Sequence, residues 1–168
     1  DTGGGIWVTG GHGTATSSGA IAIRTSNAGT KGVSGVLSFS SGTASSGTSG
    51  AVVVGTGSAS KGKGGDISLS VGSGDLAAGG DITLSAGRST SDTGGGIWVT
   101  GGYGTGTSSG AIAIRSSDAG TAGVSGVLSF SSGTASSGTS GAVVIGTGSA
   151  STGKGGDISL SVGSGDLS

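Results

Sequence analysis

The stretch Gly64–Ser70 (GGDISLS) carries the pattern that decides the expected fold. Ile67 and Leu69 alternate with small polar residues behind a glycine, which is the period of two typical of a strand with one buried face. The glycine that opens this pattern, Gly65, belongs to a series of leading glycines at positions 4, 19, 35, 50, 65, 80 and 95. Because consecutive leading glycines are 15 or 16 residues apart, the chain is an array of short repeats, which we call units.

A longer repeat contains six of these units. Residues 1–77 match residues 92–168 at an offset of 91, without a gap and with eight differences. The 16-residue step recurs at the equivalent place, between Gly110 and Gly126, and we expect its extra residue within 27–32. We therefore interpret 1–168 as one continuous array, in which 1–91 is the first large repeat and 92–168 a second copy of five units. We expect both to be part of a longer array.

The composition limits the classes of protein to which the chain can belong. Of 168 residues, 44 are Gly, 35 Ser and 20 Thr, while Pro and Cys are absent and only 9% are charged. The lack of proline excludes collagen, and the regularly spaced Ile, Val and Leu disfavour a disordered chain. A net charge of −1 argues against nucleic-acid binding. No apolar run approaches the roughly 20 residues of a membrane span.

Each unit has about six strand-like residues followed by about nine Gly, Ser, Thr and Ala. This predicts an all-β fold without helices, a parallel β-solenoid of about eleven 15-residue coils stacked about 4.8 Å apart. Residues two and four positions after each leading glycine (the inner columns) would face a shared core, and those one and three positions after it (the outer columns) would face outward. An antiparallel meander is the alternative, disfavoured because hairpin loops commonly have two to five residues. In the first large repeat the inner columns read Ile6/Val8, Ile21/Ile23, Leu37/Phe39, Val52/Val54, Ile67/Leu69 and Ile82/Leu84.

The outer columns are apolar or small in the first four units of each large repeat and polar in the units that follow. Exposed apolar patches usually mark interaction surfaces. We therefore predict an outer patch for lateral packing of a second chain, with coverage by a glycan or by the chain itself as the alternative. Its residues are Trp7, Ala22, Val36, Val53, Trp98, Val127 and Val144.

The remaining candidate sites are weak. Asp66 and Asp81 share one outer column and could hold a Ca²⁺ or a lysine such as Lys63, or stay solvated. Residues 57–64 match GxxxxGK but lack the following Ser or Thr and precede a strand pattern, so no nucleotide site is expected. The single histidine, His12, is Tyr103 in the second copy. We expect no catalytic residue, cofactor or metal site, and leave open whether the aspartate column binds an ion.

The G-x-h-x-h phase, in which h is apolar, and the Gly/Ser/Thr composition resemble the repeat arrays of secreted surface and fibre proteins of microbial eukaryotes, such as algae and related protists. The resemblance covers the whole chain. It implies the shaft of an extracellular filament, appendage or surface coat without catalytic activity. The expected partners are further copies, along the fibre axis and laterally, with O-linked glycans on exposed Ser and Thr.

A binding module, either an adhesin shaft or an ice-binding solenoid, is the alternative function. Thr14 and Thr16 suggest the start of a threonine ladder, but neighbouring units offer no aligned threonine.

Overall fold

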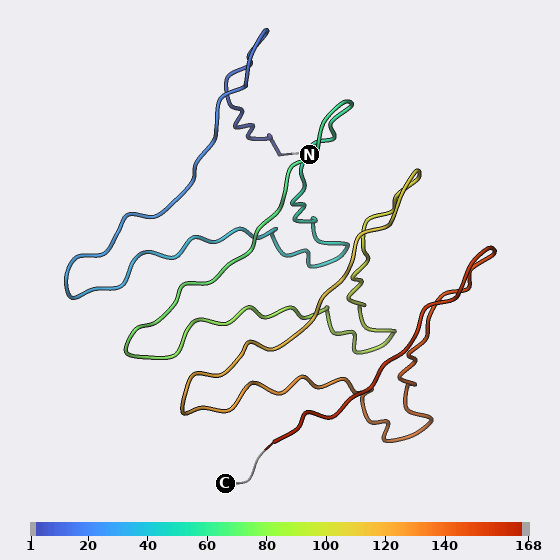
Figure 1. The fold of residues 1–168 in the computed structure, drawn as a ribbon. Helices are drawn as coiled ribbons and strands as arrows, with labels where there is room; N and C mark the ends of the chain where they lie inside the picture. Colours follow the sequence, from blue (N-terminus) through green and yellow to red (C-terminus); the bar gives the residue numbers. More distant parts are fainter. Residues whose placement is uncertain (1–2, 166–168) are drawn as a thin grey trace. The chain divides into compact units, whose positions relative to one another are not determined.

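The computed structural model describes residues 3–165. Within this range it contains neither a helix nor a strand, so that Figure 1 shows an uninterrupted tube. By its internal contacts the chain divides into two compact parts, Asp1–Thr83 and Leu84–Ser168. The prediction of a parallel β-solenoid is therefore wrong.

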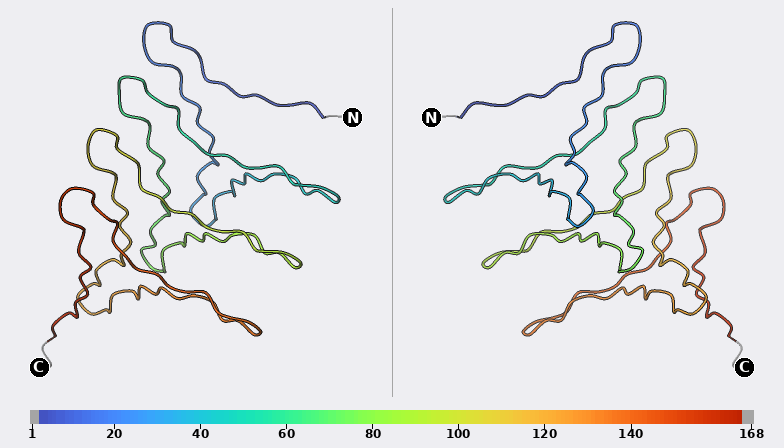
Figure 2. Two further views of the ribbon diagram at one scale, coloured as in Figure 1. Left: turned by 90° about the vertical axis from the view of Figure 1, so that its right-hand side faces the viewer. Right: turned by 90° about the vertical axis from the view of Figure 1, so that its left-hand side faces the viewer.

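Instead, the chain reverses direction once in every 15- or 16-residue unit. Extended segments alternate with short reversals, as Figures 1 and 2 show from three sides. We call each reversal with its two flanking segments a hairpin, and the segments its arms. The reversals fall at residues 14–16, 30–32, 45–47, 60–62, 75–77, 90–92, 105–107, 121–122, 136–138 and 151–153. Their spacing follows that of the leading glycines, so the sequence repeat is also the structural repeat.

Backbone hydrogen bonds between two glycines close several hairpins. The amide of Gly19 donates to the carbonyl of Gly11 at 2.8 Å, and in the second copy Gly110 donates to Gly102 at 2.8 Å. The same bond links glycines 95 and 87 at 2.9 Å and glycines 80 and 72 at 3.4 Å. Each bond joins residues eight positions apart and encloses a seven-residue loop with the reversal at its centre. The arms therefore run antiparallel beside these four reversals.

Several leading glycines lie against the residue nine positions earlier, on the opposite arm of the hairpin that precedes them. A Cβ placed on Gly50 would lie 3.6 Å from Cβ of Ser41, and one on Gly141 would lie 3.7 Å from Cβ of Ser132. At Gly65 the hydroxyl of Thr56 also donates to the glycine carbonyl at 3.1 Å. The leading glycines are therefore positions where the two arms approach closely.

The 16-residue unit has a longer loop and a different turn. The leading glycine that follows it, Gly126, approaches Ser116, ten positions earlier. In the first copy Gly35 approaches Thr25 in the same way. The extra residue thus lies between these contacts. In the second copy the amide of Gly123 donates to the carbonyl of Gly120 at 3.2 Å, which is a β-turn hydrogen bond. The longer loop is reversed by this turn.

No residue in the described part of the chain is buried, and no side chain forms a core. Ile67 and Leu69, predicted to face a shared interior, remain 52% and 74% exposed. The total accessible surface is 16,542 Å². A compact protein of this mass would expose about 7,000 Å² and a fully unfolded one about 22,000 Å². The single chain therefore still exposes most of the surface that a compact fold would bury.

The solenoid prediction failed because the Gly/Ser/Thr segments close tight reversals and do not lead the chain around a coil. A solenoid coil needs its next strand to run in the same direction as the last one. A reversal in every unit makes that direction alternate. Because, within residues 3–165, the backbone hydrogen bonds between arms are single and occur beside only four of the reversals, the repeated ladder that defines a strand does not form.

The loop between Gly87 and Gly95 is stabilised by one serine. The hydroxyl oxygen of Ser89 accepts hydrogen bonds from the amide of Asp92 at 2.9 Å and from that of Ser91 at 3.4 Å. The carboxylate of Asp92 in turn accepts from the amide of Thr93 at 2.7 Å. Such side-chain bonds to nearby amides are typical of turns rich in Ser and Asp.

Ser89→Ala is expected to loosen this loop by about 0.5–1 kcal/mol, because it removes the acceptor for two amides. Hydrogen exchange at the Asp92 amide should rise about two- to fivefold, an increase in local opening. Ser85→Ala, which lies outside the loop, is the control. Equal exchange rates in the two variants would show that the hydroxyl does not order the loop.

Candidate interaction surface

Where a large apolar side chain occupies the outer column, the two faces of the segment differ in exposure, except in the first segment, in which Ile6 is 93% and Trp7 84% exposed. In the other segments the inner-column side chain two positions after the leading glycine is half-covered, as at Leu37 and Leu128, which are both 48% exposed. Outer-column side chains in the same units, Val36 and Val127, are 89% and 92% exposed. Part of the cover on the inner side comes from the opposite arm, since a Cβ on Gly10 would lie 3.6 Å from Cγ1 of Ile21. The alternation expected from the sequence therefore exists locally, without a core.

The outer patch lies in full contact with solvent. Trp7 is 84% and Trp98 91% exposed, and Val53 and Val144 are 87% and 88% exposed. Ala22 is also exposed. These residues occupy different extended segments, so seven separate units contribute to the outer patch.

Each tryptophan ring lies over the glycine two positions earlier on the same face. A Cβ on Gly96 would lie 3.1 Å from Nε1 of Trp98, and a Cβ on Gly5 would overlap the ring of Trp7. The absence of a side chain on these glycines leaves room for the indole against the backbone. Sequence analysis missed this role of Gly5 and Gly96. The signal was available, because only the tryptophan units have glycine directly after the leading glycine.

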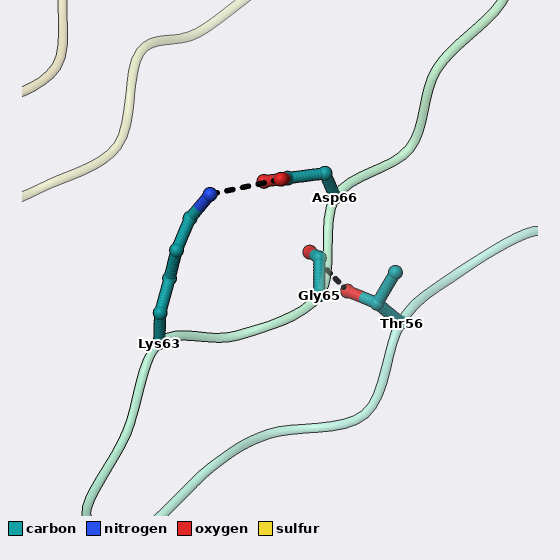
Figure 3. Close-up of polar contacts among 4 residues, drawn as sticks. All are labelled: Thr56, Lys63, Gly65 and Asp66. Atoms are coloured by element: carbon teal, nitrogen blue, oxygen red, sulfur yellow. Dashed lines mark hydrogen bonds and ion pairs between the residues drawn. The ribbon is translucent and has the colours of Figure 1, made fainter.

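The aspartate column is partly neutralised by lysine. Nζ of Lys63 lies 2.8 Å from Oδ2 of Asp66 (Figure 3). The pair recurs in the second copy as Lys154 and Asp157, at 3.1 Å. The first pair joins side chains that are 80% and 76% exposed, and such pairs contribute little to stability. Among residues 3–165, no three His, Cys, Asp or Glu side chains gather as metal ligands.

The other polar features do not repeat faithfully. A hollow of about 330 Å³ is lined by Arg24, Thr25, Ser26 and Asn27. The residue equivalent to Asn27 is Asp118, so the two copies would present different charge there. His12 and Tyr103 are both exposed.

No helix in the described part of the chain could cross a bilayer.

The apolar columns are consequently the most regular chemical feature of the molecule, and they form a candidate surface for association. No family model matches the sequence, and neither a characterised protein nor a solved structure matches it.

Proposed function

We propose that this chain is a structural repeat protein that self-associates into an extracellular filament, appendage or surface coat and has no catalytic role. The supporting observation is the exposed surface of 16,542 Å², more than twice the roughly 7,000 Å² of a compact protein of this mass. Because apolar residues contribute to this surface in every unit, the hydrophobic effect favours association of copies of the chain. Assembly supplies the burial that the single chain lacks.

The repeat suits this role because each unit offers the same kinds of contact at a fixed spacing. A second chain that binds one unit correctly meets equivalent residues at the next. Identical contacts repeated along two chains add through effective concentration, so weak single contacts give a stable assembly. We further propose that the outer patch packs such assemblies laterally and that exposed Ser and Thr accept glycans.

Ice binding is less well supported than assembly. Thr14 and Thr16 lie within the reversal at residues 14–16, and Thr105 and Thr107 lie within the equivalent reversal of the second copy. Threonines on a sharp reversal do not form part of a flat face.

Electron microscopy and sedimentation of the purified, unglycosylated chain at rising concentration test this function. We expect filaments or sheets longer than one chain, and a growing fraction of the protein in the sedimenting material. A chain that stays monomeric at all concentrations would contradict the proposal.

A further inference from the structure

The inner columns are the side-chain positions that are apolar in every unit. Every one of these positions is occupied by Ile, Val, Leu or Phe. The outer columns carry Asp66, Asp81 and Asp157 in the units that follow each apolar stretch. The two faces therefore differ in continuity as well as in exposure.

We propose that the inner columns form the self-association face and pack against the inner columns of a second copy of this chain. This inference rests on the proposed function and specifies which face performs it. The occupant is a second copy because the face is complementary to itself. Ile, Val, Leu and Phe recur on both chains at the same spacing of 15 or 16 residues.

The exposed area is sufficient for such an interface. The chain exposes about 9,500 Å² more than a compact protein of its mass, whereas a standard protein interface buries about 1,600 Å² in total. Inner-column side chains have much of this area still to bury, from 48% exposure at Leu37 to 93% at Ile6. Covering them with another apolar face removes this surface from water.

The outer columns are less suited to continuous packing. Burying Asp66 and Lys63 would strip water from two charged groups that are now 76% and 80% exposed. Even a paired charge is costly to remove from water, whereas the inner columns carry no charge. The outer patch can therefore provide only interrupted contacts.

The test compares apolar residues inside and outside the inner columns. The inner-face variant carries Leu37→Ser with Leu128→Ser, and the control carries Val33→Ser with Val124→Ser, which lie outside both the inner columns and the outer patch and are 97% and 96% exposed. Both are made in the full, unglycosylated chain, and self-association is measured by sedimentation over a range of concentrations. Hydrogen exchange at the Gly19 amide checks that both variants keep their hairpins.

We expect the inner-face variant to weaken self-association about tenfold or more, because each interface loses large apolar side chains. The control should weaken it less than about threefold. Equal weakening, or a larger effect of the control, would overturn the inner-face assignment while leaving self-assembly intact. A parent chain that remains monomeric would overturn both this inference and the proposed function.

Discussion

Alanine at Gly10 and Gly101 is expected to open the hairpins that reverse at residues 14–16 and 105–107. An added Cβ at either position would lie 2.5 Å from the carbonyl oxygen of Gly19 or Gly110, respectively. Backbone atoms cannot rotate away as a side chain can, so the arms must separate. The hydrogen bond between Gly11 and Gly19 would then weaken, at a cost of about 1 kcal/mol. Exchange of the Gly19 amide should become about fivefold faster.

The adjacent glycines provide a matched control. A Cβ on Gly11 or on Gly102 meets nothing within 4 Å. Gly11→Ala with Gly102→Ala should therefore leave the exchange of the Gly19 and Gly110 amides nearly unchanged. If both pairs of variants had the same effect, the close approach of the arms would not be what requires glycine.

Trp7→Ser combined with Trp98→Ser is expected to abolish lateral bundling while leaving individual filaments intact. The two indoles are the largest side chains of the outer patch and are almost fully exposed. Burying an aromatic side chain contributes on the order of 2–3 kcal/mol, so each lost contact should weaken lateral association about tenfold or more. Filament width, measured by electron microscopy, should fall to that of the thinnest filaments of the parent chain.

Val33→Ser combined with Val124→Ser serves as the comparison for the tryptophan variants. These valines are 97% and 96% exposed and lie outside the outer patch. Their replacement removes exposed apolar surface without touching the patch, and bundle width should be preserved. Bundles that persist in the tryptophan variant, or disappear in the valine variant, would contradict a lateral role for the patch.

The sequence predicted the periodicity of this structure better than its topology. The positions of the leading glycines, from Gly19 to Gly156, anticipate where the hairpins close. The period of two also anticipates the difference between Leu37 and Val36, since local alternation depends only on backbone geometry. Neither signal specifies whether consecutive segments run parallel or antiparallel, because both arrangements share the same side-chain alternation.

A second set of glycines contained the missing information about direction. A glycine stands eight positions before most leading glycines, for example Gly11 before Gly19 and Gly72 before Gly80. Paired glycines around a seven-residue loop favour a reversal, since both arms can then approach without a side chain between them. Some reversals also end on a glycine in the left-handed region, with φ of 113° at Gly138 and 105° at Gly153. This signal was overlooked because hairpin loops commonly have two to five residues, whereas the loops here have seven.

The outer patch was defined by residue type and column, and each of its residues is exposed. A lysine partner for Asp66 was one of three alternatives, beside a Ca²⁺ ion and a solvated carboxylate, and Nζ of Lys63 lies 2.8 Å from Oδ2 of Asp66. The lack of a core could not be foreseen from the columns. Alternation shows which side chains share a face but not what covers that face.

The antiparallel approach of the arms can be tested most directly by a disulfide between positions 41 and 50. The chain has no cysteine of its own, and the Cβ atoms at these positions would be 3.6 Å apart, within the range of natural disulfides. Ser41→Cys with Gly50→Cys should form an intrachain disulfide under mild oxidation of the dilute chain, detected by mass spectrometry. Little cross-linking there, together with efficient cross-linking of Gly50→Cys with Gly65→Cys, would contradict a chain that reverses in every unit.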